Sequence, residues 1–275
     1  MFLSIDIGGT KTLLALFSFR GLCLKRLKFP TPKSPEAFLK TLTSSLESFL
    51  SEKSRARLKA VTIAVPGRIK FEQNFCSISC PNLPWGEFDL LTPLRNLFSC
   101  KIFFANDANL ATLYESSRKK AGKTVYLTFS TGIGGGLAKN SHLLKSSDSF
   151  EPGHKKYLFN GKSLEWEDFA SARALSKAYS SPLSSLKLTP EIKSDLVSRL
   201  SSGLIDILKS ESPDLLIVGG PLGLIFKNLK KPLLSFLEKS LKTEKSSLPE
   251  LEPAHRPTES TIYGAYLYSK EHYKD

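Results

Sequence analysis

The sequence contains few cysteines, and they follow no recognisable pattern. Cys23, Cys76, Cys80 and Cys100 are scattered through 275 residues, form no CxxC pair and have no pattern of nearby histidines. So few thiols in so long a chain are not a disulfide framework. We therefore expect free thiols that mostly serve packing.

The sequence also lacks a long apolar segment. No run of about 18 uninterrupted apolar residues occurs, and the N-terminus enters a predicted strand without a basic region or a small-residue cleavage site. These absences predict a soluble, cytoplasmic protein without a membrane partner.

A third absence concerns nucleic-acid recognition. The chain carries 39 Lys and Arg against 26 Asp and Glu, a formal net charge of +13, which raises a nucleic-acid-binding hypothesis. However, it has no Arg-rich arm and no aromatic platform motif, and its lysines are spread along predicted helices and loops. We expect a lysine-rich solvated surface that attracts anionic substrates, and no nucleic-acid partner.

The length of 275 residues exceeds what one hydrophobic core usually serves and favours two domains. Apolar runs bounded by turn residues predict strands at residues 3–7, 13–19, 22–29, 60–65, 102–105, 124–129 and, after a glycine turn, through residue 137. Helices are predicted after Pro35 and at residues 108–119. Because one strand, turn, strand plan is used twice, we expect two similar α/β units.

The second half of the chain is more helical. An apolar stripe with a spacing of four residues predicts one helix, with Ile192, Leu196, Leu200, Leu204 and Leu208 on one face. This helix should end before Pro213, and residues 214–218 predict a buried parallel strand. Residues 243–257 look the least ordered, and residues 258–268 predict a closing helix. A glycine inside a helix costs stability, so Gly264 should allow close packing on the sheet or on a nucleotide.

Three predicted strands end in glycine-rich turns, namely Asp6-Ile-Gly-Gly-Thr-Lys11, Ser130-Thr-Gly-Ile-Gly-Gly-Gly136 and Gly219-Gly220-Pro221. Such a turn suits a phosphate group, because backbone N–H groups point at it without Cβ atoms in the way. One glycine turn alone is more often a hairpin or an ordinary strand-to-helix connection. The first two together, with Asp6 at a strand end, favour a pair of turns that bind one phosphate chain.

Several short motifs occur in a fixed order: Asp6-Ile-Gly-Gly-Thr-Lys11, Pro66-Gly67, Ala105-Asn-Asp-Ala108, Ser130-Thr-Gly-Ile-Gly-Gly-Gly136, Glu151-Pro-Gly-His154 and Ile217-Val-Gly-Gly220. In this order and spacing they resemble the ROK family of sugar kinases and repressors over nearly the whole chain. The resemblance implies the actin-like ATPase fold, with two ribonuclease H-like α/β domains and a cleft between them. The domains would comprise residues 1–107 and 108–259, with a C-terminal helix at about residues 260–275 packed back on the first.

The resemblance also implies transfer of the γ-phosphoryl group of ATP to the 6-hydroxyl of a hexose, with Mg²⁺ as cofactor. Glucose is favoured because Pro81-Asn-Leu-Pro-Trp85 resembles glucokinases more than kinases of acetylated sugars. The alternatives are polyphosphate as donor, an N-acetylhexosamine or fructose as acceptor, and a catalytically silent sugar-binding regulator. Repressor members carry an N-terminal helix-turn-helix domain, for which we expect no room here. Because relatives are often dimers, we expect a homodimer.

The family's site residues map onto this chain as follows. The sugar would be bound by Asn82, Asn106, Asp107, Glu151, His154 and Glu167, with Glu165 as the rival of Glu167. Asp107 would be the general base at the sugar hydroxyl, or else only the cap of the helix that it precedes. The phosphates would be bound by Asp6, Gly8, Gly9, Thr10, Lys11, Thr131, Gly132, Gly134, Gly135, Gly219 and Gly220. Asp6 would hold Mg²⁺ through water.

Residues 159–171 depart from the family pattern. Many ROK kinases carry a CxCGxxGC zinc element here, whereas this stretch has no cysteine. Because a four-coordinate zinc site cannot be built from it and His154 lacks partners, we expect no structural zinc. Ala172 and Pro221 also stand where the family usually has glycine, in the sugar-side motif and the adenosine-side turn respectively.

Overall fold

The computed structural model describes residues 1–72, 75–79, 83–119, 121–241 and 248–274, and the chain divides into two compact units. Unit 1 comprises Met1–Tyr114 and Thr261–Asp275, and unit 2 comprises Glu115–Ser260. The chain passes from unit 1 to unit 2 within helix α4 (Asp107–Ser117). The sequence analysis placed this boundary at the start of the helix, after residue 107. The first turns of α4 stay with unit 1 because Leu110 packs on helix α10 (Ser260–His272).

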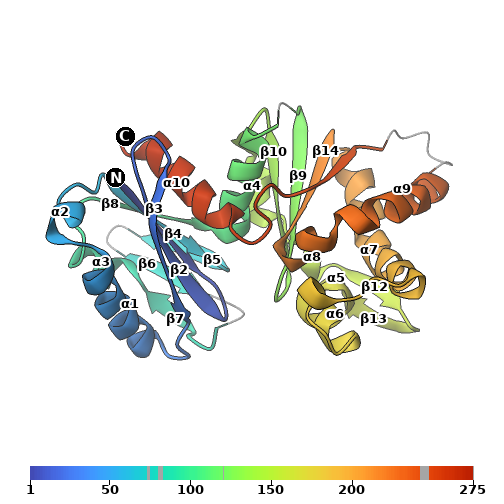
Figure 1. The fold of residues 1–275 in the computed structure, drawn as a ribbon, viewed down its shortest axis with the longest axis horizontal. Helices are drawn as coiled ribbons and strands as arrows, with labels where there is room; N and C mark the ends of the chain where they lie inside the picture. Colours follow the sequence, from blue (N-terminus) through green and yellow to red (C-terminus); the bar gives the residue numbers. More distant parts are fainter. Residues whose placement is uncertain (73–74, 80–82, 120, 242–247, 275) are drawn as a thin grey trace. The chain divides into compact units, whose positions relative to one another are not determined.

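Unit 1 is built on a five-stranded sheet. Its strands are β1 (Phe2–Ile7), β2 (Lys11–Phe17), β3 (Cys23–Pro30), β4 (Ala60–Val65) and β8 (Lys101–Asn106), in the order β3-β2-β1-β4-β8 (Figure 1). The first three strands pair in antiparallel fashion, whereas β1, β4 and β8 are parallel. The apolar runs predicted as strands form this sheet.

Helices cover both faces of the unit 1 sheet. Helix α1 (Pro35–Phe49) begins at the Ser34 cap, whose hydroxyl accepts from the Ala37 N–H, and it buries Phe38, Leu42, Leu46 and Phe49. These residues pack with Leu3, Ile5 and Ile7 in one core cluster. On the other face, Ile262 and Tyr266 of α10 pack on Phe2 and Phe17. The two faces of β1 are thus buried by different helices.

A second, three-stranded sheet in unit 1 was not predicted from the sequence. It contains β5 (Arg68–Glu72), β6 (Phe75–Ser79) and β7 (Glu87–Asp89), and it is followed by the short helix α3 (Leu91–Arg95). The remaining element of the unit is the short helix α2 (Glu52–Arg55).

Unit 2 repeats the arrangement of unit 1. The strands β9 (Lys123–Phe129), β10 (Ile133–Lys139), β11 (His142–Leu143), β14 (Leu215–Gly219) and β15 (Glu250–Pro253) lie in the order β11-β10-β9-β14-β15. As in unit 1, an antiparallel hairpin precedes two strands that run parallel to its first strand. The prediction that one plan is used twice is confirmed.

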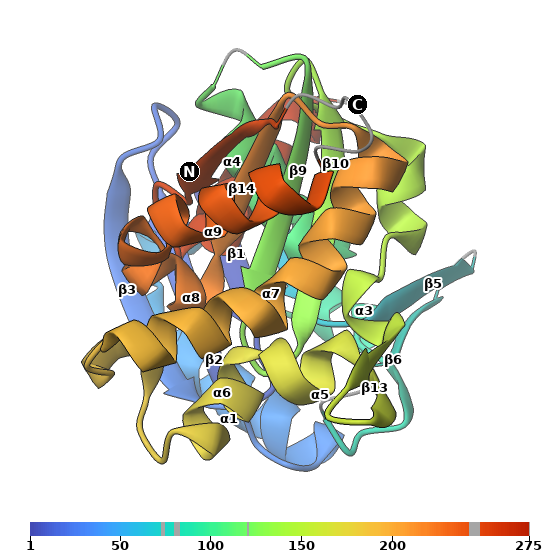
Figure 2. The same ribbon diagram turned by 90° about the vertical axis from the view of Figure 1, so that its right-hand side faces the viewer.

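Two long helices, α7 (Pro190–Glu211) and α9 (Lys227–Leu241), lie together on one face of the unit 2 sheet (Figure 2). Leu196, Leu200, Leu204 and Leu208 are buried in its core, which confirms the predicted stripe. The smaller elements of the unit are the 3-10 helices Lys145–Ser149, Pro152–His154 and Leu183–Ser185, the hairpin β12 (Lys156–Phe159) and β13 (Lys162–Glu165), and the helices α5 (Trp166–Ala170), α6 (Ala172–Ala178) and α8 (Gly220–Ile225).

One sequence prediction is wrong in unit 2. Residues 243–257 were expected to be the least ordered part; residues 243–247 lie outside the described residues, but β15 lies within the rest and pairs with β14. The segment was misjudged because Glu and Pro are depleted in strands and only Leu251 of β15 is buried. Of the described helices, none combines the length and the apolar character that crossing a bilayer requires.

Candidate functional site

Two carboxylates lie at the carboxyl edge of the unit 1 sheet and interact through their charges. Asp6 of β1 lies level with Ala64 of β4, which lies level with Ala105 of β8, and Asp107 follows β8 directly. Loss of water around the partly buried Asp6 and the charge of Asp107 raise the pKa of Asp6 to about 7, although Lys28 acts in the opposite direction. Two adjacent carboxylates at a strand end are hard oxygen donors, the type that Mg²⁺ prefers.

The helix that starts at Asp107 is capped by its neighbour. Asn106 Oδ1 accepts from the backbone N–H of Ala108 at 2.9 Å and of Asn109 at 3.1 Å. Asp107 is the first residue of α4, and its Oδ1 accepts from the Ala108 N–H at 2.8 Å. Asn106 Nδ2 donates to the Gly67 carbonyl at 3.4 Å. The capping role that the sequence left open for Asp107 therefore belongs to Asn106.

The first glycine turn is a tight hairpin between β1 and β2. Gly8 N–H donates to the Lys11 carbonyl at 3.0 Å, and a Cβ at Gly8 would lie 2.8 Å from that oxygen. Thr31, which follows β3, stabilises the turn by two hydrogen bonds. Its hydroxyl donates to the Gly8 carbonyl at 2.7 Å, and its N–H donates to the Thr10 carbonyl at 3.0 Å. The sequence analysis missed Thr31, because a threonine after a strand carries no signal of this long-range contact.

Glu167 lies against the second glycine turn. Its Oε2 accepts from the Ile133 N–H at 3.1 Å. A Cβ at Gly132 would lie 2.4 Å from this oxygen, and one at Gly153 would lie 2.9 Å from it. The glycines therefore leave the space that the carboxylate occupies. At Gly135 a Cβ would meet the Phe150 ring at 2.6 Å, so this glycine is also required by packing. Thr131 and Gly134 are partly buried in the same turn.

His154 has acidic neighbours, which corrects the expectation that it lacks partners. Its Nδ1 lies 3.0 Å from Glu165 Oε2. Ligand atoms of His154, Glu165 and Glu167 all lie within 4.8 Å of one another. The hydrogen bond to Glu165 raises the pKa of His154, with smaller contributions from the charges of Glu167, Glu165 and Glu151. Both rivals for the sugar ligand thus lie beside His154, Glu165 bonded to the ring and Glu167 to the glycine turn.

The third glycine turn is shaped by the neighbouring strand. A Cβ at Gly219 would lie 2.1 Å from the Tyr126 hydroxyl, and one at Gly220 would lie 2.3 Å from the Phe129 carbonyl oxygen. Gly220 also has a positive φ of 69°, which favours glycine. Both glycines are therefore needed by the packing of this turn against β9, whether or not a ligand binds there.

Gly264 does not face the sheet or leave space for a nucleotide. A Cβ on it would lie 1.8 Å from the Leu110 carbonyl oxygen, so it allows α10 to approach α4. Ala265 packs with Ala64 and Leu110. The expectation of close packing is confirmed, but the partner is a helix that the sequence analysis did not consider.

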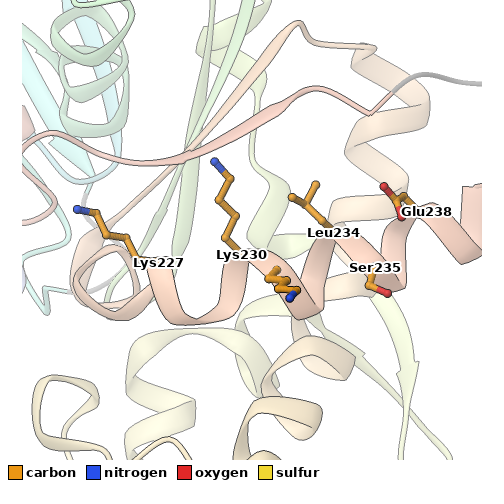
Figure 3. A pocket seen from close by; sticks show the side chains of 6 residues that line it. Lys227, Lys230, Leu234, Ser235 and Glu238 are labelled. Atoms are coloured by element: carbon orange, nitrogen blue, oxygen red, sulfur yellow. The ribbon is translucent and has the colours of Figure 1, made fainter.

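A surface hollow of about 430 Å³ lies along α9. It is lined by Lys227, Lys230, Lys231, Leu234, Ser235 and Glu238 (Figure 3). Lys230 pairs with Glu252 at 2.8 Å. The hollow contains none of the predicted site residues, but its three lysines make it cationic.

The predicted site residues fall into two sets. Unit 1 holds Asp6, Gly8, Gly9, Thr10, Lys11, Asn106 and Asp107, and unit 2 holds Thr131, Gly132, Gly134, Gly135, Glu151, His154, Glu167, Gly219 and Gly220. Glu151 is exposed, next to the 3-10 helix that ends at His154. Asn82 and Cys80 lie outside the described residues.

Comparison with known proteins gives concordant results. Residues 2–272 match the model of the ROK family. The chain is 30% identical over 158 residues to the xylose repressor of Bacillus subtilis, an alignment that covers 53% of this chain but only 41% of the repressor. It is 25% identical over 292 residues to the fructokinase of Lactococcus lactis subsp. cremoris, with 98% of both chains covered.

Among solved structures, the fold is similar to that of a ROK family glucokinase from Streptomyces griseus in complex with glucose and AMPPNP. The TM-score is 0.80 at 21% identity, with 98% of this chain and 99% of that chain covered. The family match over nearly the whole chain and the doubled sheet topology agree with the actin-like ATPase fold. This chain is a member of the ROK family.

Proposed function

We propose that this protein is a hexose kinase that transfers the γ-phosphoryl group of ATP to the 6-hydroxyl of a hexose, with glucose as the preferred sugar. The observation that carries the proposal is that two neighbouring residues at the start of α4 have different roles. Asn106 caps the helix, and Asp107 presents a carboxylate beside Asp6. A helix start with two acidic or amide residues needs only one of them as its cap. Asn106 holds the cap, and the motif Ala105-Asn-Asp-Ala108 resembles the ROK pattern in which the Asp, here Asp107, lies at the sugar hydroxyl.

Asp107 would act as the general base. Its carboxylate would accept the proton of the sugar hydroxyl and orient the oxygen toward phosphorus. Phosphoryl transfer has a loose transition state, so orientation and charge stabilisation contribute most of the rate enhancement. Asp6 would hold Mg²⁺, and the bound ion would supply positive charge for the phosphates. A cation beside Asp6 favours its ionised form and so counteracts the raised pKa of this carboxyl.

The glycine turns would bind the phosphate chain of the donor. Gly8, Gly9, Thr10 and Lys11 offer backbone N–H groups and a cation in the first turn, and the hydrogen bonds from Thr31 hold that turn in one conformation. Thr131, Gly132, Gly134 and Gly135 would act similarly in the second turn, and Gly219 and Gly220 in the third. A fixed conformation matters because donors that are already oriented need no reorganisation during the reaction.

Polar residues would recognise the sugar hydroxyls. Glu151, His154 and Glu167 would act from unit 2, and Asn82, Asn106 and Asp107 from unit 1. A site that pairs each hydroxyl discriminates against sugars that leave a buried polar group unmatched. Since Asn106 Oδ1 is occupied by capping, its amide N–H₂ is the part suited to a sugar oxygen.

The relatives support a sugar ligand but differ in activity. The fructokinase relative aligns over almost its entire length and makes fructose a second acceptor to test. The xylose repressor relative makes a sugar-binding regulator the non-enzymatic alternative. The AMPPNP in the Streptomyces griseus glucokinase supports ATP as the donor. Gly264, now explained by its contact with Leu110, no longer supports an adenosine site.

A second candidate donor is inorganic polyphosphate. The observation that favours it is the hollow on α9, whose three lysines would attract a polyanion. Nonetheless, ATP remains the proposed donor, because the hollow contains none of the glycine turns.

The proposal is tested by coupled assays of purified protein with glucose, fructose, mannose, N-acetylglucosamine and N-acetylmannosamine, each with ATP and with polyphosphate. We expect the highest kcat/KM for glucose with ATP and Mg²⁺. A higher kcat/KM with polyphosphate would replace the proposed donor. If no sugar is phosphorylated but calorimetry detects sugar binding, the regulator alternative replaces the enzyme. A homodimer would give about twice the 30.4 kDa chain mass in light scattering.

A further inference from the structure

The helix that carries Asp107 also carries a buried acid near its other end. Glu115 is only 2% exposed. Its carboxylate accepts from the backbone N–H of His255 at 2.8 Å and of Arg256 at 3.1 Å, and it lies 2.5 Å from the Ser260 hydroxyl. Burying a carboxyl group is costly unless hydrogen bonds satisfy its oxygens, and these three donors meet that requirement.

The donors to Glu115 all come from the segment that leads into α10. Ser260 is the first residue of α10, and its hydroxyl also lies 2.8 Å from the Arg256 carbonyl. The chain passes from unit 1 to unit 2 after Tyr114 and returns after Ser260. By hydrogen bonds within unit 2, Glu115 therefore links the segment where the chain enters this unit to the segment where it leaves it.

The other end of α4 is held by the same helix. The Thr261 hydroxyl donates to the Asp107 carbonyl at 3.4 Å. In the middle of α4, the Leu110 carbonyl is in close contact with Gly264, and the Tyr114 and Tyr263 rings lie 5.2 Å apart. Figure 1 shows α4 and α10 side by side. The two helices thus contact each other at Asp107, Leu110 and Tyr114 of α4.

From these contacts we infer that Glu115 is a positioning residue for Asp107. Eight residues separate them, about 12 Å along a helix that transmits a displacement as a rigid rod. The hydrogen bonds of its carboxyl group fix α4 against the start of α10 and so fix the direction of the Asp107 carboxylate. Glu115 itself contacts no substrate in this account. The inference rests on the proposed function, because it assigns Glu115 a role in that reaction.

Glu115→Gln tests the inference with little change in side-chain size. The amide N–H₂ of glutamine would face N–H donors and cannot accept from all of them. We expect kcat for hexose phosphorylation to fall about tenfold to a hundredfold, the scale of a small misplacement of a reacting group. The KM for the sugar should stay within about twofold, and Glu115→Asp, which keeps the charge, should recover part of kcat.

Asp214→Asn is the matched control. Asp214 also uses a carboxylate to accept a backbone N–H, that of Lys123 at 2.6 Å, but this residue precedes β14 and not α10. Because Asp214 is exposed, we expect a smaller loss of melting temperature than for Glu115→Gln, with kcat close to wild type. An unchanged kcat in folded Glu115→Gln, or an equal loss of kcat in Asp214→Asn, would overturn the inference.

A second readout needs no activity. Hydrogen exchange of the free protein should show faster exchange in peptides covering residues 107–112 for Glu115→Gln, and not for Asp214→Asn. Unchanged protection there in Glu115→Gln would overturn the inference even if wild-type protein phosphorylated no sugar. Failure of the proposed function is thereby distinguished from failure of the positioning role.

Discussion

Asp6 and Asp107 lie at the same carboxyl edge of the unit 1 sheet, at the ends of β1 and β8, and burial together with the charge of Asp107 raises the pKa of Asp6 to about 7. Two neighbouring carboxylates of this kind are unfavourable in the free protein. A site that binds a cation benefits from such an arrangement, because the cation removes the repulsion between them. The raised pKa of Asp6 makes the stability of the substrate-free protein depend on pH.

The stability of the Mg²⁺-free protein should fall as pH rises from about 4 to about 7. In this window Asp6 is protonated in the folded state but ionised in the unfolded state, whose pKa is near 3.8. The folded state therefore binds more protons, and the free energy of unfolding decreases with pH. Asp6→Asn cannot ionise and should melt higher than wild type at pH 8, with little difference at pH 4.

Melting temperatures between pH 4 and pH 8 check this prediction, with Glu36→Gln, at an exposed position of α1, as the control. The control should follow the wild-type curve. If the melting temperatures of wild type and Asp6→Asn changed in parallel with pH, the pKa of Asp6 would not be raised, and the prediction would be wrong.

Gly264→Ala should destabilise the protein. The new methyl group would lie 1.8 Å from the Leu110 carbonyl oxygen, so α10 must move away from α4. Overpacking of this kind costs about 1–3 kcal/mol, more than the gain in helix propensity of about 1 kcal/mol. Urea unfolding measures the change. Ser210→Ala, at an exposed position of α7, should change stability by less than about 0.5 kcal/mol. Equal stabilities of the two variants would contradict the close contact.

The purified protein should contain far less than one zinc per chain. The cluster of His154, Glu165 and Glu167 offers one imidazole and two carboxylates but no thiolate. Of the cysteines, the described Cys23, Cys76 and Cys100 are free and belong to unit 1, whereas the cluster belongs to unit 2. Elemental analysis and melting with and without a chelator measure this. About one zinc per chain, lost on chelation together with stability and absent from His154→Ala, would refute the prediction.

The central strands of both sheets could be predicted because they are continuous apolar runs. Ala60–Val65 is buried at every position and has the predicted bounds, and the stripe of α7 follows a helical period. The short strand β15 could not be predicted, because its pairing with β14 depends on the sheet and not on its own residues.

The candidate site was predictable in its motifs but not in its contacts. Asn106 and Asp107 are both suitable caps by residue type, and only the helix start at Asp107 decides between them. Likewise, Glu115 carries no local signal, because its partners His255, Arg256 and Ser260 are about 140 residues away in the chain.

The turnover of Asp107→Asn with glucose, ATP and Mg²⁺ tests the central claim most directly. Asparagine keeps the size of the side chain but cannot accept the proton, so kcat should fall by at least about 10²-fold. Sugar affinity and melting temperature should stay close to wild type, because Asn106 provides the cap. Asn106→Ala, by comparison, should lose about 0.5–2 kcal/mol of stability. An inactive, folded, sugar-binding Asp107→Asn protein is the predicted result, and near-wild-type turnover would contradict the account.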